Sequence, residues 1–217
     1  MLVGAGFYVL NQVRKPTRLV GRPFLWLMNH SHSGVTDWGL THVRVEKQSS
    51  VLDVGCGGGR TIQKLAAMAS EGTVFGVDYS AESVAAARAK NATLIKTGRV
   101  DIRQASVSKL PFPADHFDLV TAVETQYYWP ALVEDMQEIL RVLKPGGTLI
   151  VIVESYKGGK LDVVQRPVMK LLRSRVLSVA EEQELFTSAG YIEVQTYEER
   201  NKGWMCATGR KSEPERG

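Results

Sequence analysis

The sequence is poor in cysteine. It contains only Cys56 and Cys206, which lie far apart along the chain. Two distant cysteines exclude a disulfide framework and a cysteine-based metal site. We therefore expect a reducing, cytoplasmic setting. Because Cys56 lies within a glycine-rich turn, where a small side chain fits, we interpret it as a packing residue and not as a nucleophile.

The chain also lacks a long hydrophobic run and a strong excess of one charge. The apolar run Met1–Leu10 is too short to cross a bilayer, and its basic residues follow it, whereas a secretory signal has them in front. The net charge is +4, and much of the excess lies near the two ends. No basic stripe with interleaved aromatic residues is present. These absences argue against an integral membrane segment and against a nucleic-acid partner.

The N-terminal segment differs in composition from the rest of the chain. It is either a helix packed on the domain as a lid, or an interfacial segment with weak membrane affinity and a basic flank beginning at Arg14. We favour the lid, because the apolar run is short and interrupted by glycine.

With 217 residues the chain can form one domain with a large core. We expect a helical leader at 1–48, the main domain at 49–210 and a polar tail at 211–217.

Histidines and a tryptophan stand together near the end of this leader. His30 and His32 could form a metal-binding pair, but no third ligand of suitable spacing follows nearby, so we expect no metal. Together with Trp38, they are candidates for a substrate pocket that closes over a bound ligand. The alternative is that Trp38 belongs to the core and that both histidines are solvated.

The stretch Val51–Arg60 organises the rest of the chain. It begins as a short apolar strand containing Asp53, continues as a glycine-rich turn and ends where a helical pattern starts. Gly55, Gly57 and Gly59 permit a sharp turn and leave no side chain between the backbone and a ligand. The helix that follows directs free N–H groups to the same place. This order is typical of a nucleotide site at the first strand of an open α/β sheet.

The spacing of the glycines indicates which nucleotide binds. A dinucleotide fingerprint has a small residue where this chain has Arg60, and Asp53 would repel a pyrophosphate. An acid at this position suits a ligand with an ammonium group, which favours S-adenosylmethionine. A nicotinamide-dependent oxidoreductase is the alternative, and Arg60 argues against it.

A second acid lies near the end of the next strand, which we expect at 73–80. A carboxylate at this strand's tip, Asp78, can accept hydrogen bonds from both hydroxyls of a ribose. Capping a helix is the alternative role, but Ser80 is better placed to cap the helix expected at 81–90. Tyr79 is placed to lie on the adenine face.

Aromatic residues are grouped after the fourth expected strand. Tyr127, Tyr128 and Trp129 would be costly to expose, and we do not expect all three to be core. We predict that they form one wall of an apolar substrate pocket. The remaining pattern predicts strands at 99–104, 117–124 and 148–154, a helix at 133–143 ended by a turn at 144–147, a helix capped at Ser178, and a hairpin over 191–208.

The order of four motifs along the chain resembles that of a known protein family. The motifs are Val51–Gly59, Val77-Asp78, Leu110–Pro113 with Phe117-Asp118, and Arg141–Gly147. The chain resembles the class I S-adenosylmethionine-dependent methyltransferases, and within them the type 11 group that includes ubiquinone/menaquinone C-methyltransferases. The resemblance implies a Rossmann-like, doubly wound α/β fold whose seven-stranded sheet has its last strand antiparallel.

The resemblance also implies where the cofactor lies. It places S-adenosylmethionine across Asp53, Gly55, Gly57, Asp78 and the tip of the third strand. Our cofactor-binding candidates are Asp53, Gly55, Cys56, Gly57, Asp78, Tyr79, Ser106, Val107 and Glu124. One departure matters, because the family commonly has an aspartate at the position of Ser106 to accept the adenine amino hydrogen. A neutral serine oxygen is a weaker acceptor.

Methyl transfer from a sulfonium is a direct displacement, so the protein mainly aligns the nucleophile and desolvates the charge. A base is needed only for a nucleophile of high pKa, and the candidates are His30, His32, Glu124 and Tyr156. Glu124 is equally placed to contact the cofactor's amino group. We expect a methyltransferase with a small-molecule acceptor that is apolar or aromatic, such as a quinone-like or other lipid molecule. A non-catalytic protein that binds S-adenosylmethionine is the remaining alternative.

Overall fold

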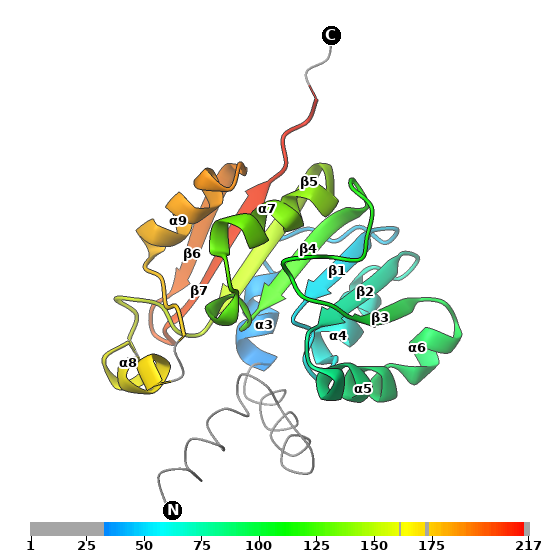
Figure 1. Cartoon of the computed structure of the whole chain (residues 1–217), viewed down its shortest axis with the longest axis horizontal. Coiled ribbons are helices and arrows are strands. Elements are labelled where there is room, and N and C mark those ends of the chain that lie inside the picture. The colour runs from blue at the N-terminus through cyan, green and yellow to red at the C-terminus, as the bar shows by residue number, and fades with distance from the viewer. Residues whose placement is uncertain (1–32, 161, 172–173, 215–217) are drawn as a thin grey trace, which may run out of the picture.

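A seven-stranded sheet forms the centre of the molecule. The computed structural model describes residues 33–160, 162–171 and 174–214. The strands are β1 (Ser50–Val54), β2 (Thr73–Asp78), β3 (Val100–Gln104), β4 (Phe117–Val123), β5 (Leu143–Val153), β6 (Ile192–Glu199) and β7 (Trp204–Arg210). Their order in the sheet is β3-β2-β1-β4-β5-β7-β6 (Figure 1). The first five strands are parallel, and β7 is antiparallel to both of its neighbours, as the family resemblance implies.

Helices cover both faces of this sheet (Figure 1). The helices are α3 (Ser33–Leu40), α4 (Arg60–Met68), α5 (Ala81–Lys90), α6 (Ala92–Lys96), η1 (Gln126–Tyr128), α7 (Leu132–Val142), α8 (Asp162–Leu171) and α9 (Val179–Ser188). Buried residues of α3, α4 and α5 pack in one hydrophobic cluster, and those of α7 and α9 pack in another. The fold is therefore doubly wound, as expected.

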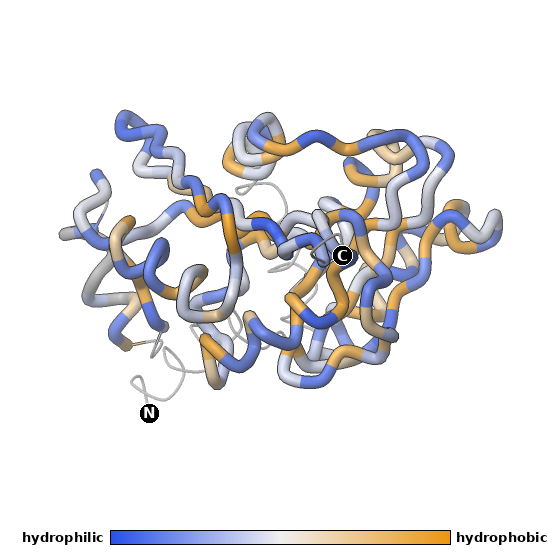
Figure 2. The backbone as a smooth tube through the Cα atoms, turned by 90° about the horizontal axis from the view of Figure 1, so that it is seen from above, coloured by the Kyte–Doolittle hydropathy of each residue, from blue (hydrophilic) through white to orange (hydrophobic). Residues whose placement is uncertain are grey.

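The two clusters follow from the pleat of the strands. Neighbouring residues of one strand point to opposite faces, so Val51 packs with α3, α4 and α5, while Leu52 packs with α7 and α9. Ile150 and Val151 of β5 divide in the same way. A strand covered on both faces reads as a continuous apolar run. Figure 2 shows such hydrophobic stretches separated by hydrophilic ones along the described part of the chain.

The helix caps agree closely with the sequence prediction. Ser80 caps α5 by accepting a hydrogen bond from the Ser83 N–H, and Ser178 forms a capping box with Glu181 at the start of α9. The largest boundary difference is at β5, which begins at Leu143 and includes the residues that we predicted as a turn. Leu143 pairs with Phe117 of β4, and Gly147 accepts a hydrogen bond from the Lys211 N–H, so this segment is held from both sides.

Helix α3 packs against the main domain. Val35 and Leu40 are buried, and Gly39 lies so close to β5 that an added Cβ would be 2.5 Å from the side chain of Ile152.

At the other end of the chain, Lys211 belongs to the predicted polar tail. Its Nζ donates to the carbonyl oxygen of Leu143 at 2.8 Å, so it contacts the C-terminus of α7. None of the helices within the described residues has the length and hydropathy needed to cross a membrane.

Arg99 fastens the end of α4 to the start of β3. Its Nε donates to the carbonyl oxygen of Gly72 at 2.6 Å, and its Nη2 donates to that of Ala66 at 3.1 Å. Further bonds reach the carbonyl oxygens of Ala69 and Ser70. A helix C-terminus leaves carbonyl groups without intrahelical partners, and a cation there is also favoured by the helix dipole.

We expect Arg99→Ala to lower the free energy of unfolding by about 2 kcal/mol, because several partly buried carbonyl groups lose a charged donor. Urea unfolding followed by circular dichroism measures this change. Arg44→Ala is the matched control, since Arg44 forms only a highly exposed ion pair with Glu46 and its loss should change little. Equal effects of the two substitutions would contradict the capping role of Arg99.

Candidate functional site

A cavity of about 430 Å³ opens where the strand order reverses, at the carboxyl ends of β1 and β4. The chain runs from β1 outward to β3 and then crosses to β4 on the other side of β1, which leaves a crevice between the loops that follow these two strands. All nine cofactor-binding candidates line this cavity. They come from the ends of β1 and β2 and from the turns after β1, β2, β3 and β4, so the topology gathers residues that are far apart in the sequence.

The glycine-rich turn is fixed by its own backbone. The N–H groups of Gly55 and Cys56 both donate to the carbonyl oxygen of Val77, at 2.8 and 2.9 Å, which ties the turn to β2. Gly55 has a φ of 73°, and an added Cβ would lie 2.1 Å from Oγ1 of Thr125. Gly57 also has a positive φ, of 49°, but an added Cβ there would meet no atom within 4 Å. The backbone at Gly57 therefore borders open space in the cavity.

Asp53 brings a buried carboxyl group to the cavity. It is only 2% exposed, and its Oδ1 accepts a hydrogen bond from the Thr121 hydroxyl at 2.7 Å. Burial raises the pKa of Asp53 to about 7, the Thr121 bond opposes this shift, and the nearby Asp78 charge adds to it. A ligand with a positive charge would relieve the cost of ionising this group.

Asp78 lines the cavity from the tip of β2. Its Oδ2 accepts a hydrogen bond from the Gly57 N–H at 3.0 Å, and its Oδ1 accepts one from the Ser80 N–H at 2.9 Å. Burial raises the pKa of Asp78, while these two bonds lower it. Each carboxylate oxygen can accept a further bond, so this fixed side chain fits the two hydroxyls of a ribose.

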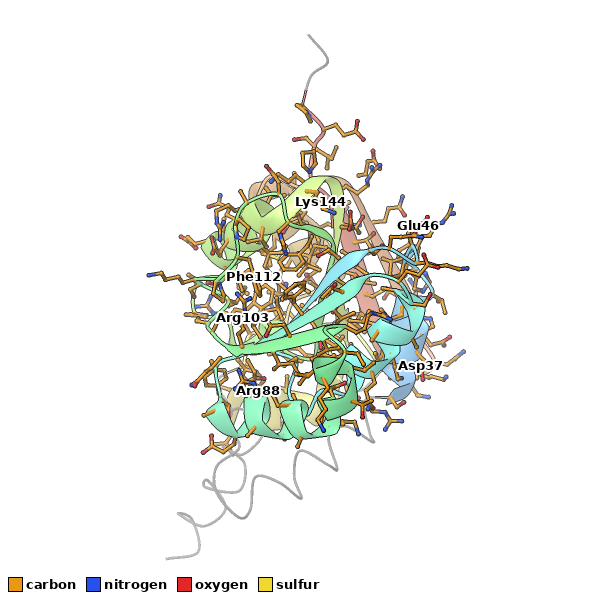
Figure 3. The ribbon with its side chains drawn as sticks, turned by 90° about the vertical axis from the view of Figure 1, so that its right-hand side faces the viewer. Asp37, Glu46, Arg88, Arg103, Phe112 and Lys144 are labelled. Carbon is orange, nitrogen blue, oxygen red and sulfur yellow. The ribbon has the colours of Figure 1, made fainter. Side chains whose placement is uncertain are left out.

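The side of the cavity predicted to hold adenine is more open to solvent. Tyr79 is 44% exposed, and Ser106 is also exposed, whereas Val107 is buried. The Ser106 hydroxyl accepts a hydrogen bond from the Ser108 N–H at 3.2 Å, which orders the loop after β3. The guanidinium of Arg103 on β3 lies over the ring of Phe112, 4.9 Å from its centroid, and Figure 3 labels both residues.

Glu124 lines the cavity directly after β4 and has a positive φ of 56°. Its Oε1 accepts a hydrogen bond from the Glu154 N–H and lies 3.5 Å from the hydroxyl oxygen of Tyr127. The hydroxyl of Tyr127 also accepts a bond from the Ser155 N–H at 3.0 Å. Glu124 is thus held at the ends of β4 and β5, which makes it a fixed wall of the cavity.

The predicted aromatic wall is only partly present. Tyr128 and Trp129 line the cavity, but Tyr127 does not, and it packs in the core of the α7 and α9 face. The prediction for Tyr127 is therefore corrected. Its hydroxyl satisfies the backbone at the end of β5. Trp129 is equally buried and packs in the same cluster, but it also borders the cavity.

Two further candidates lie outside the cavity lining. Trp38 lies with its ring 6.1 Å from that of Trp204 and 5.0 Å from that of His42, so it packs α3 on the β6–β7 hairpin. Tyr156 donates a hydrogen bond to Oε1 of Glu198 at 2.7 Å, and burial first, then this bond, raises its pKa to about 12. Tyr156 is therefore unsuited to act as a base. The candidates His30 and His32 lie outside the described residues.

The sequence interpretation missed several residues of the lining. Arg60, Thr61 and Lys64 come from the first turns of α4. Arg60 and Lys64 are four residues apart, a spacing that places both on one face of a helix. The others from outside the motifs are Ser33, Thr36, Ser83, Ala105, Val123, Thr125 and Pro130. Ser33 and Thr36, three residues apart on α3, could have been found only by knowing that α3 packs beside α4.

These residues fit the cofactor that the sequence suggested. A buried acid at Asp53 suits an ammonium group, Asp78 suits a ribose, and the bare backbone at Gly57 allows a close approach. When bound, S-adenosylmethionine supplies a methyl group on a positively charged sulfur. Within the described part of the chain, no group of three or more His, Cys, Asp or Glu side chains is arranged to hold a metal ion.

Comparison with known proteins also indicates a methyltransferase. A family model described as a methyltransferase domain matches residues 52–151. The chain is 23% identical to an uncharacterized methyltransferase, YdaC, of Bacillus subtilis, over 86% of this chain and 96% of that protein. It is 35% identical to the demethylmenaquinone methyltransferase of Listeria monocytogenes, over 49% of this chain and 45% of that protein. The chain thus spans less than half the length of this second relative.

Solved structures share the fold. A chain in the complex of the Haloferax volcanii Trm112 methyltransferase activator superposes with a TM-score of 0.76 and 25% identity, over 88% of this chain and 94% of that one. Human N-acetylserotonin methyltransferase, solved with S-adenosylmethionine, superposes with a TM-score of 0.72 and 19% identity, over 87% of this chain and 55% of that one. The chain is therefore an S-adenosylmethionine-dependent methyltransferase that is similar to the type 11 group, and S-adenosylmethionine is its cofactor.

Proposed function

We propose that this methyltransferase acts on a small-molecule acceptor with an apolar or aromatic body, and that it transfers the methyl group by direct displacement. The observation that carries the proposal is the composition of the cavity at the ends of β1 and β4. Acids from the tips of β1, β2 and β4 lie with Tyr128, Trp129 and Pro130 in the same lining. The acids suit the cofactor, and the aromatic segment suits an acceptor that prefers apolar surroundings.

The residues of the chain contribute mainly by binding and orientation. Asp53 and Asp78 are fixed by hydrogen bonds before any ligand arrives, so little conformational freedom is lost when the cofactor binds. Tyr128 and Trp129 exclude water from their side of the cavity. A displacement reaction is accelerated when both partners are held in line in a dry site.

We propose that no described side chain is required as a base. Tyr156 is bonded to Glu198 outside the cavity lining, and the carboxylate of Glu124 accepts a backbone hydrogen bond from Glu154. An acceptor that is already nucleophilic, such as a reduced quinone ring or its phenolate, needs only alignment. The name of the Listeria relative, a demethylmenaquinone methyltransferase, supports a quinone-like acceptor.

We also propose that the segment around α3 closes the cavity on the acceptor side. Ser33 and Thr36 line the cavity, and Thr36 is buried. Lys64 of α4 donates hydrogen bonds to the carbonyl oxygen and hydroxyl of Ser33, which holds the start of α3 over the helix beside the site. This arrangement supports the interpretation of the N-terminal segment as a lid.

Calorimetric titration with S-adenosylmethionine tests the cofactor site. We expect Asp78→Asn to weaken binding about 10- to 100-fold, because it removes a charged acceptor for the ribose hydroxyls. Asp101→Asn is the matched control, since Asp101 lies on the edge strand β3 and pairs with Arg103, away from the cavity lining. If both variants bind as tightly as the parent protein, Asp78 is not the ribose anchor.

The raised pKa of Asp53 predicts a pH-dependent stability for the ligand-free protein. In the unfolded chain this carboxyl loses its proton near pH 4, and in the folded protein near pH 7. Between these values the folded state binds more protons, so this group's contribution to stability falls as pH rises. We expect Asp53→Asn to become progressively more stable than the parent from pH 5 to pH 7.5 in thermal unfolding.

The same variant should lose most of the stabilisation that saturating S-adenosylmethionine gives the parent protein, because the ammonium group loses its anionic partner. If the difference in stability between the ligand-free Asp53→Asn variant and the parent protein does not change with pH, the assignment of this titration to Asp53 is contradicted.

The acceptor side is tested with labelled S-adenosylmethionine and a panel of reduced quinones, phenols, amines and fatty acids. With the best acceptor, we expect Tyr128→Ala to lower kcat/KM at least about 10-fold, while the dissociation constant of the cofactor changes less than about twofold. Tyr79→Ala should show the opposite pattern, with weaker cofactor binding. Preference for polar, charged acceptors, or equal effects of both variants on cofactor binding, would argue against the apolar pocket.

A further inference from the structure

Within the described residues, three buried acids lie outside the cavity lining. They are Asp135, Asp162 and Glu182, and Asp135 is fully buried. Asp135 lies in the first turn of α7, and its two carboxylate oxygens bond to two different segments of the chain. A buried carboxylate is costly unless its oxygens are hydrogen-bonded, so these bonds fix where both segments lie.

The first of these segments is the loop after β3. The Ser108 hydroxyl donates a hydrogen bond to Oδ1 of Asp135 at 2.6 Å. Ser106, which lines the cavity, accepts the Ser108 N–H on its hydroxyl at 3.2 Å and the Lys109 N–H on its carbonyl oxygen at 3.1 Å. Because these bonds close a tight turn, Ser106 is held wherever Ser108 is held. Asp135 therefore fixes the side of the cavity that is predicted to receive adenine.

The second segment is the acceptor wall, which consists of Tyr128, Trp129 and Pro130. Proline has no N–H, so the N–H of Ala131 is the first backbone donor after Trp129. It donates to Oδ2 of Asp135 at 2.9 Å, and the Asp135 N–H donates to the Ala131 carbonyl oxygen at 2.7 Å. These bonds fix the end of the acceptor wall to the start of α7.

Helix capping accounts for only one of the two carboxylate bonds. Ala131 is the N-cap residue of α7, so Asp135 satisfies a backbone donor at the helix start, where a negative charge is also favoured. The bond from Ser108 comes from a loop 27 positions earlier in the sequence and contributes nothing to the cap. It is a short, charge-assisted contact between two parts of the cavity lining.

We propose that Asp135 is a positioning residue that joins the adenine side of the cavity to the acceptor wall. A cofactor bound against Ser106 then fixes Trp129 through the chain of bonds from Ser108 to Asp135 to Ala131. The acceptor therefore meets a wall that is already ordered, and the two ligands strengthen each other's binding. This inference rests on the proposed function, which places the acceptor against residues 128–130.

A ligand that occupies only the adenine side tests this connection without any acceptor. Adenosine has the adenine and the ribose of the cofactor but lacks the sulfonium and the amino-acid chain. Its effect on Trp129 would be followed by fluorine NMR of the full chain labelled with fluorotryptophan. The variant Trp129→Phe identifies the signal, and calorimetry gives the dissociation constant of adenosine.

Two substitutions break the connection at different points. Ser108→Ala removes the hydroxyl donor at an exposed position, whereas Ser108→Thr keeps a hydroxyl. Asp135→Asn replaces one acceptor oxygen by an N–H donor, so one of the two bonds is lost. Ser188→Ala is the matched control, because Ser188 is an exposed serine at the end of α9 and lies outside the cavity lining.

We expect saturating adenosine to shift the Trp129 signal in the parent protein, in Ser108→Thr and in Ser188→Ala. In Ser108→Ala and Asp135→Asn the shift should fall to less than about half, while the dissociation constant of adenosine rises less than about threefold. With saturating S-adenosylmethionine and the best acceptor of the panel, Ser108→Ala should raise the acceptor KM about fivefold or more and change kcat less than about twofold.

A Trp129 shift that is as large in Ser108→Ala as in the parent protein would overturn the inference, because adenosine would then act on Trp129 directly. Absence of a shift in the parent protein would overturn it as well, since the two sides would not be joined. If no acceptor of the panel is methylated, the proposed function fails, but the fluorine signal still decides whether Asp135 joins the two sides.

Discussion

Two hydrogen bonds to the carbonyl oxygen of Val77 hold the site together. The consecutive N–H groups of Gly55 and Cys56 donate them. They pull the turn after β1 against the end of β2, which places the Asp78 carboxylate within reach of the Gly57 N–H. Because both acids then line one cavity, the turn sets the spacing between the groups that recognise an ammonium and a ribose. The hydrophobic layers on the two faces of the sheet keep β1 and β2 in register for this contact.

The fold was predictable from the sequence because its signals are local. The glycines of the turn, the caps at Ser80 and Ser178 and the apolar strands each depend on neighbouring residues, and the structure has each of them near its predicted position. The nine cofactor candidates lie in one cavity lining for the same reason, since all stand at strand ends or belong to the motifs of a known family. Parallel strands then bring these ends to one edge of the sheet.

The errors concern contacts between segments that are distant in the sequence. Nothing near Tyr127 indicates that its hydroxyl satisfies the backbone at Ser155, and nothing near Tyr156 indicates its partner Glu198. In the same way, the role of Trp38 depends on Trp204, and the lining residues of α3 depend on the bonds from Lys64. Local patterns report whether a side chain is aromatic or charged, but only the packed structure decides which neighbour it meets.

The place of β7 in the sheet has a consequence for how the protein is made. β5 and β6 do not pair with each other, since Trp204–Arg210 is inserted between them and is synthesised after both. Until that segment leaves the ribosome, one side of β5 is an open edge with the apolar run Leu149–Val153, which can join strands of other chains. Completion of the sheet is therefore a late step, and chains stalled shortly before Trp204 should depend on chaperones more than finished ones do.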